Sequence, residues 1–336
     1  MEDNRQYPPT TQPMVEPTHE MHEPYTPPKK RMPWNKLALL FIIMGAIMSI
    51  AGWATGGRGG SIAFINGGFH VVTAADRTSS HISFAGENIT NIHVNAVDTR
   101  IIVESGSNFA VFLTNVDEDT VELSGNTLNI NVPSHHRRIH FMNIGFYSVS
   151  NEIRIQVPPQ QMDSITLTGT SSNVVVEGIS VTNLDARSTS GSVRLWDIEA
   201  ETLNARSTSG SVRGANVHFS TGHLQSTSGS VNFTHISWDS LYAQSTSGSV
   251  RFEDARIHLD RIQGGSTSLQ STSSSVNLNI SNRRDDFRYD LNSRTGSVRM
   301  DGDRFVAHGG STVINGNGHP IAMRSTSGNV RLNFDS

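Results

Sequence analysis

Arginine recurs at two fixed places around a polar phrase that this 336-residue sequence repeats. The phrase is STSGSV, and it begins at Ser188, Ser207, Ser226 and Ser245, nineteen residues apart each time. Arginine follows the valine of the phrase, or the equivalent valine of a later copy, at Arg194, Arg213, Arg251, Arg299 and Arg331, and Arg187 and Arg206 stand directly before the phrase. Guanidinium groups bind phosphate and carboxylate through paired hydrogen bonds. The pattern therefore predicts either a cationic stripe that binds an anionic polymer or a solvated face balanced by nearby acids.

Paired carboxylates, which glycoside hydrolysis needs about 5–9.5 Å apart, are not evident in the repeats. Asp197 and Asp254 occupy equivalent positions, but three units separate them, about 14 Å if the units stack at the spacing of β-strands. We therefore expect a binding protein rather than an enzyme, and we assign no catalytic residue and no cofactor. A polysaccharide-active enzyme is the alternative.

Other chemistry has weaker support in the sequence. The stretch SHHRRIH, Ser134–His140, holds three histidines, but its two arginines would repel a cation and no acid lies near, so we expect a solvated loop and no metal site. The sequence has no cysteine, which excludes disulfides and cysteine-based zinc sites. A formal net charge of −4 gives no reason to expect nucleic acid as a partner.

The elements that position the arginines are predicted to be short β-strands. Strings such as EIRIQV and SITLTG alternate apolar and polar residues, and glycine or asparagine separates them. A fixed period of about nineteen residues predicts an all-β fold, a β-solenoid whose coils stack about 4.8 Å apart. Val212 should then lie between Val193 and Val231. An antiparallel sandwich is the alternative, although it requires no fixed period.

The phrase itself is expected to form a corner of each coil. We expect its glycines, such as Gly210, to adopt a positive φ. Both serines that flank the threonine, such as Ser207 and Ser209, are expected to point inward, and Thr208 outward.

Four regions are predicted along the chain. Residues 1–36 hold eight of the twelve prolines and should be a disordered tail. Residues 37–53 carry no charge and predict one membrane-spanning helix; the basic residues before it place the tail in the cytoplasm. A cleaved signal peptide is the alternative. Residues 54–79 should be a linker with a first strand, and residues 80–336 the extracytoplasmic repeat domain.

The stretch EIRIQVPPQQMDSITLTGTSSNVVVEGISVTNLDARSTSGSVRL, residues 152–195, resembles a family of bacterial β-strand-repeat proteins known as "putative adhesins", a domain of unknown function that includes LiaG-like proteins. The resemblance covers roughly residues 80–333. It implies the repeat fold and a single membrane helix, and it supplies no catalytic residues.

These observations together predict a membrane-anchored, extracytoplasmic β-solenoid that acts as an adhesin-like or envelope-sensing binding module. The expected partners are the lipid bilayer, through residues 37–53, and an anionic envelope polymer or an envelope protein. A self-assembling structural scaffold is a further alternative.

Overall fold

The computed structural model describes residues 34–54, 61–65, 68–72, 78–133, 143–145, 150–259, 265–301, 303–305, 311–315 and 317–334. The chain divides into two compact units, Met1–Arg58 and Gly59–Ser336. Residues 1–33 of the proline-rich tail and the stretch SHHRRIH lie outside the described residues. Residues 34–36, predicted to be disordered, belong instead to helix α1 (Trp34–Ala54).

The first unit contains one helix, α1 (Trp34–Ala54), over the segment predicted to span a membrane. Its large apolar side chains from Leu39 to Met44 and at Ile47 are 49–68 % exposed. Among the residues that the structure describes, no helix is both long enough and apolar enough to cross a membrane. The membrane anchor therefore stays a prediction.

The second unit is built from β-strands, as the alternating sequence predicts. Strands β1 (Ser61–Ile65), β2 (Gly68–Val72) and β9 (Asn143–Gly145) form a small antiparallel sheet. All the other strands belong to one sheet of 21 strands. Two short 3-10 turns, η2 (Glu118–Thr120) and η4 (Arg284–Asp286), interrupt them.

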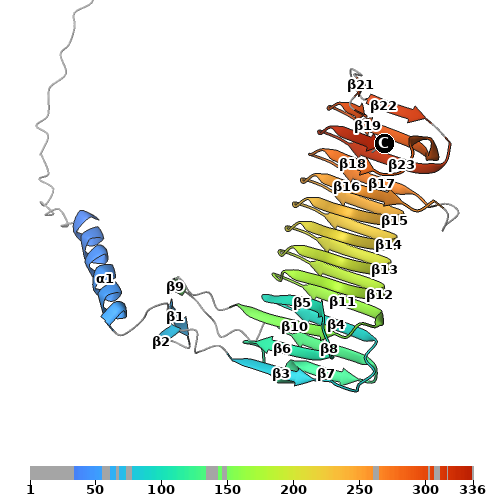
Figure 1. Ribbon diagram of the computed structural model, residues 1–336. Helices are drawn as coiled ribbons and strands as arrows, with labels where there is room; N and C mark the ends of the chain where they lie inside the picture. The colour runs from blue at the N-terminus through green and yellow to red at the C-terminus, as the bar shows by residue number, and fades with distance from the viewer. Residues whose placement is uncertain are drawn as a thin grey trace, which may run out of the picture. The chain divides into compact units, whose positions relative to one another are not determined.

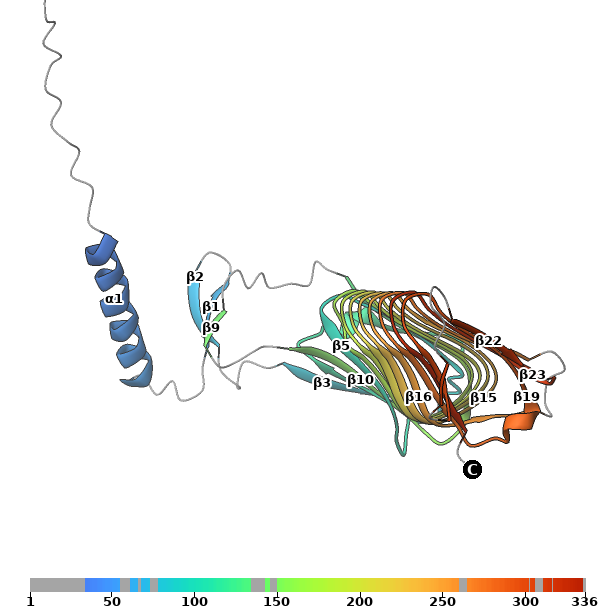
Figure 2. The same cartoon turned by 90° about the horizontal axis from the view of Figure 1, so that it is seen from above.

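Four long strands form the middle of the large sheet, and each holds one repeat of the sequence (Figure 1). They are β12 (Val174–Ser188), β13 (Val193–Ser207), β14 (Val212–Ser226) and β15 (Val231–Ser245). They lie parallel and in register, so that paired residues are nineteen positions apart. Seen from above, successive repeats have the same outline and lie over one another with a small, steady offset (Figure 2). The parallel register rules out the antiparallel sandwich for these repeats.

Each long strand bends twice, so one repeat has three sides. In β12 the pairing with β13 runs over residues 174–177, 179–181 and 183–188, with gaps at Gly178 and Thr182. Burial alternates on the second and third sides and changes phase at the gaps, whereas on the first side Val175 is buried along with Val174 and Val176. A third bend is the STSGS corner between consecutive long strands.

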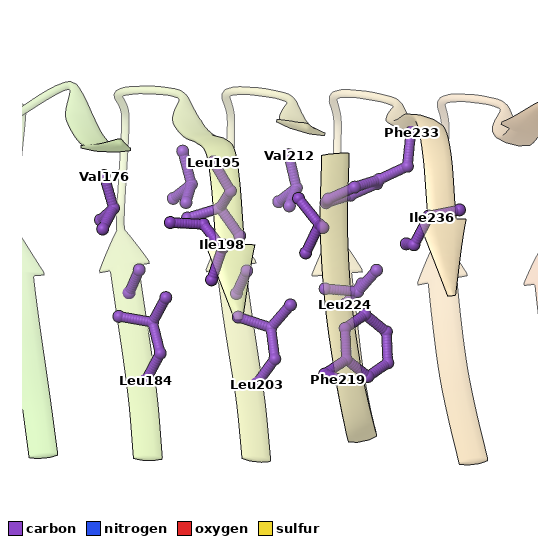
Figure 3. Close-up of a cluster of buried hydrophobic side chains, with 14 of the residues drawn as sticks. Val176, Leu184, Leu195, Ile198, Leu203, Val212, Phe219, Leu224, Phe233 and Ile236 are labelled. Atoms are coloured by element: carbon purple, nitrogen blue, oxygen red, sulfur yellow. The ribbon is translucent and has the colours of Figure 1, made fainter. Parts of the chain in front are cut away.

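Stacking buries one continuous apolar core. Val193, Val212 and Val231 pair in register and all are 0 % exposed, which confirms their predicted order. Figure 3 shows side chains from successive strands, such as Leu184 and Leu203, one beside the next in the interior. A single repeat could not bury these side chains alone.

Toward the C-terminus, the stacking order departs from the chain order. The strands there are β16 (Val250–Ile257), β17 (Thr267–Ser271), β18 (Val276–Ile280), β19 (Phe287–Ser293), β20 (Val298–Met300), β21 (Asp303–Phe305), β22 (Ser311–Asn315), β23 (His319–Ser325) and β24 (Val330–Phe334). The last strand, β24, pairs with β18 on one edge and β20 on the other. Likewise β23 lies between β17 and β19. The final repeat is therefore inserted between two earlier ones.

The N-terminal end shows the same kind of insertion. Its strands are β3 (Ser79–Ser83), β4 (Asn91–Ala96), β5 (Thr99–Ser105), β6 (Ala110–Thr114), β7 (Val121–Ser124), β8 (Thr127–Val132), β10 (Asn151–Val157) and β11 (Gln161–Gly169). Strand β5 lies between β10 and β12, and β4 lies between β8 and β11.

Antiparallel strands close both ends of the stack. At one end β6 pairs with β10 and β3 pairs with β6, and β7 pairs with β8. At the other end β21 pairs with β20 and β22 with β19. Among the described strands, those that end the stack are short, which disfavours extension by another chain.

Candidate functional site

The STSGS corner is held by the first serine of each phrase. Ser207 Oγ donates a hydrogen bond of 2.8 Å to the carbonyl oxygen of Gly191, in the preceding corner. The same Oγ accepts one of 2.9 Å from the backbone N–H of Gly210, in its own corner. Ser207 is buried and Thr208 exposed, as predicted, but Ser209 is also exposed. The expectation that both serines point inward is therefore wrong for the second.

The corner glycines are needed for close backbone approach and not for their φ angle. Among the described residues, the glycines with positive φ are Gly86, Gly125, Gly178 and Gly318, and none of these belongs to an STSGS phrase. A Cβ on Gly210 would lie 2.2 Å from the carbonyl oxygen of Gly191. The predicted positive φ is wrong, because each corner packs directly on the backbone of the one before it.

Left-handed residues form the neighbouring corner of each repeat. Asp197 and Asn216 have φ of 54°, and His235 and Asp254 have φ of 49°; Gly178 takes the same place in β12 with φ of 68°. Short polar residues and glycine tolerate this conformation best. The acids of this column thus have a structural role at the bend. Asn216 and His235 separate Asp197 from Asp254, as the register predicted.

The seven arginines named from the sequence, which we call the arginine stripe, lie in two outward columns on either side of the STSGS corner. In the first column Arg194 pairs with Arg213, which is followed by Asn232 and Arg251. The column continues through Asn277 to Arg331 and Arg299. The inserted β24 thereby brings Arg331 next to Arg299.

The second column is shorter. Arg187 pairs with Arg206, and glutamines occupy the next three positions, Gln225, Gln244 and Gln270. Arg324 pairs with the last of them. The sequence analysis did not include this arginine, although it stands directly before the copy of the phrase that begins at Ser325.

Only part of the stripe is balanced by acids. Arg187 forms an ion pair with Asp185, and the hydrogen bond and charge of Asp185 raise the pKa of this guanidinium. Arg251 lies 3.9 Å from Glu253. For the other five, Arg194, Arg206, Arg213, Arg299 and Arg331, the described residues supply no ion-pair partner within 4.0 Å. The solvated, charge-balanced interpretation therefore fits Arg187 and Arg251 alone.

Two of these five guanidinium groups are partly withdrawn from solvent. The Nε atoms of Arg206 and Arg299 are buried and have no hydrogen-bond partner. A buried donor without a partner is costly.

A further arginine and an acid pair in this region were missed by the sequence analysis. Arg154 belongs to the same column, because it pairs with Ile102 and Ile102 pairs with Val175. Arg154 forms ion pairs with Glu104 at 2.8 Å and with Glu152 at 3.0 Å. Burial lowers the pKa of Arg154, but the two acids raise it overall.

The acid pair consists of Glu104 and Glu177. They are register neighbours because β5 is inserted beside β12, although 73 residues separate them in sequence. The expectation that no column carries acids in consecutive layers was limited to the regular repeats, and this pair lies at the junction of β5 and β12, where the first of them begins. In the part of the chain that the structure describes, no three potential metal-ligating side chains form a cluster.

The model of the Toastrack DUF4097 family matches residues 88–333, which is most of the chain. The chain belongs to this family. The predicted family resemblance, placed at roughly residues 80–333, is confirmed. No curated protein matches the sequence.

Solved structures of low sequence identity resemble this Toastrack protein. One is a "putative adhesin" from Bacteroides fragilis, with 11% identity over 77% of this chain and 98% of that chain and a TM-score of 0.39. A second, from Parabacteroides merdae, carries the same description, with 10% identity over 76% and 97% and a TM-score of 0.36. A third is a "putative lipid binding protein" from Parabacteroides distasonis, with 11% identity over 76% and 97% and a TM-score of 0.33.

Proposed function

We propose that this Toastrack protein is a membrane-anchored β-solenoid that binds an anionic polymer of the cell envelope along its arginine stripe. The observation that carries the proposal is the in-register pairing of Arg194 with Arg213 and of Arg331 with Arg299. Among the described residues these four have no acid within ion-pair distance. A bound anion would compensate these charges.

The energetics favour a repeating ligand. Neighbouring strands lie about 4.8 Å apart, so the paired guanidinium groups repel each other unless an anion lies between them. Phosphate and carboxylate oxygens accept two hydrogen bonds from one guanidinium. A polymer that carries such groups at regular intervals offers one anion to each cation of the stripe.

The closed ends of the stack argue against the alternative function of a self-assembling scaffold. A scaffold that polymerises end to end by strand pairing needs an exposed edge strand, and short edge strands disfavour such pairing. Here antiparallel strands cover both ends. We therefore favour binding by the long sides of the stack over assembly through its ends, and we propose no catalytic role.

We also propose that α1 anchors the protein, with the N-terminal tail in the cytoplasm. The support is the uncharged run from Leu37 to Trp53 and the basic residues Lys29, Lys30, Arg31 and Lys36 before it. Protease added to protoplasts should degrade the repeat domain and spare a tag at the N-terminus. A protease-resistant repeat domain would refute this orientation.

The binding proposal is tested by removing three unpaired cations. In the variant Arg194→Gln, Arg213→Gln, Arg331→Gln, affinity for a purified teichoic acid or acidic polysaccharide at low salt should fall about tenfold. Each exposed charge contact contributes up to about 1 kcal/mol. Binding by the parent protein should also weaken as salt screens the charges.

A matched control variant has the same net charge as this triple variant. Arg256→Gln, Arg283→Gln, Arg288→Gln removes three exposed arginines that lie outside the two columns. This control should bind like the parent. An equal loss of affinity in both variants would show that net charge alone decides binding. Unchanged affinity in the stripe variant would refute the site.

A further inference from the structure

Trp196 is an outward-facing aromatic residue beside the arginine stripe. It follows Arg194 by two residues on β13, so both side chains lie on the same face of the strand. Trp196 is partly exposed, whereas the other tryptophan of the repeats, Trp238, is 0 % exposed and donates its indole N–H to Thr267. Burial therefore explains Trp238 but does not explain Trp196.

The neighbours of Trp196 leave its ring without a partner. In register, Trp196 lies between Glu177 and Ala215, and Thr234 follows. The side chain of Ala215 is a single methyl group and cannot cover an indole. No described residue makes a ring contact or a hydrogen bond with Trp196. In contrast, the outward rings of His223 and Tyr242 lie 4.8 Å apart.

Two parallel rows define the surface around this ring. One row is Trp196, Ala215 and Thr234, and the other is Arg194, Arg213 and Asn232. Acids bound the first row, with Glu177 before it and Glu253 after it. We call these six residues the Trp196 platform. It is neutral along one row and cationic along the other, and it spans three repeats.

The platform matches the chemistry of a sugar ring that carries a carboxylate. The C–H face of a pyranose packs on an indole ring, and the indole N–H can donate to a hydroxyl. A carboxylate on the same sugar would reach the arginine row beside it. An extended chain of pyranoses also advances by close to the strand spacing of about 4.8 Å per sugar. A polyphosphate has the charge but no ring to stack.

We infer that the ligand of the stripe is an acidic polysaccharide, with one sugar stacked on Trp196 and its carboxylates bound by Arg194 and Arg213. This inference rests on the proposed function and adds the class of polymer. The acids at both ends of the Trp196 row confine the close contact to about three sugars.

The test compares two polyanions on the full chain in detergent. The probes are an oligomer of galacturonic acid and inorganic polyphosphate, titrated at low salt. Replacement Trp196→Ala should weaken binding of the oligogalacturonate about tenfold, the size of one ring-stacking contact, and leave binding of polyphosphate within about twofold. Arg194→Gln with Arg213→Gln should weaken both. Tyr242→Ala, an outward aromatic residue on another side of the repeat, is the control and should bind both like the parent.

A second measurement follows the indole itself. Oligogalacturonate should change the tryptophan fluorescence of the parent, and Trp196→Phe should abolish that change, while the buried Trp238 reports that the variant is folded. Equal weakening of both probes by Trp196→Ala, or of neither, would overturn the inference. Binding of polyphosphate alone would overturn the inference and leave the proposed function standing. Binding of neither probe would overturn both.

Discussion

Ser207 joins two consecutive repeats through Gly191. Its hydroxyl donates to the Gly191 carbonyl of the preceding corner and accepts from Gly210 of its own corner. Equivalent pairs of hydrogen bonds are made by Ser188, Ser226, Ser245, Ser293 and Ser325. One hydroxyl thus satisfies two backbone groups that would otherwise be buried without partners.

Replacement Ser207→Ala should therefore lower the free energy of unfolding by about 1–3 kcal/mol, because it leaves a buried N–H and a buried carbonyl unsatisfied. Urea unfolding measures the change. The exposed neighbour Ser209→Ala is the control and should change stability by less than about 0.5 kcal/mol. Equal losses in the two variants would contradict the role given to the first serine.

Gly210 should not tolerate any side chain. In Gly210→Ala the new Cβ would lie 2.2 Å from the Gly191 carbonyl oxygen, and a fixed backbone cannot move away without disturbing the stack. We expect destabilisation of about 1–3 kcal/mol or more, seen as a lower melting temperature. Thr208→Ala, in the same corner but exposed, should melt near the parent. A Gly210→Ala protein as stable as the parent would show that the corners pack less closely.

The left-handed column can be tested at Asn216. A β-branched residue is strained at a φ of 54°, so Asn216→Val should lose about 1–2 kcal/mol relative to Asn216→Gly. Both variants lose the 2.8 Å hydrogen bond from Asn216 to Asp197, so the comparison isolates the cost of backbone strain. Chemical unfolding of the two variants gives the difference, and equal stabilities would exclude backbone strain.

His319 should make stability depend on pH. Burial lowers its pKa, and the negative charge of Asp239 only partly offsets this. The unfolded chain, whose histidines titrate near about 6.5, then binds more protons than the folded protein. The contribution of His319 is therefore intact above that pH and falls as the pH drops toward the lower folded pKa.

The variant His319→Gln isolates this effect from other groups, since Nε2 of His319 lies 3.3 Å from Thr267 Oγ1 and an amide can occupy a similar place. Unfolding free energies of parent and variant should be measured between about pH 8 and pH 5. The parent should lose stability relative to the variant as the pH falls. A difference that does not change with pH would contradict the lowered pKa.

Polymer length should affect binding in steps. The pair Arg194–Arg213 and the pair Arg331–Arg299 are separated, centre to centre, by five strand spacings, about 24 Å. An anionic oligomer long enough to reach both pairs gains a second, intramolecular contact. Affinity for a series of oligomers should therefore rise sharply near that length. The variant Arg331→Gln should remove the rise while it leaves short oligomers unaffected; a smooth increase in both proteins would argue against two linked sites.

The sequence determined the repeat and its interior. The nineteen-residue period placed Val193, Val212 and Val231 in one buried column, because side chains on a strand alternate and equivalent residues of stacked strands coincide. The same argument placed Arg194 beside Arg213. It was wrong about Ser209 and about the φ of the corner glycines, since a repeated phrase does not reveal which of its atoms contact the next corner.

The tertiary structure alone decided which repeats are neighbours at the two ends. Every repeat presents the same strand edges and a similar apolar interior, so local sequence does not distinguish one neighbour from another. The pairing of β24 with β20 makes Arg331 adjacent to Arg299, and that of β5 with β12 makes Glu104 adjacent to Glu177. Both contacts join segments far apart in sequence, and they form only when the intervening chain folds back and inserts a strand into the stack.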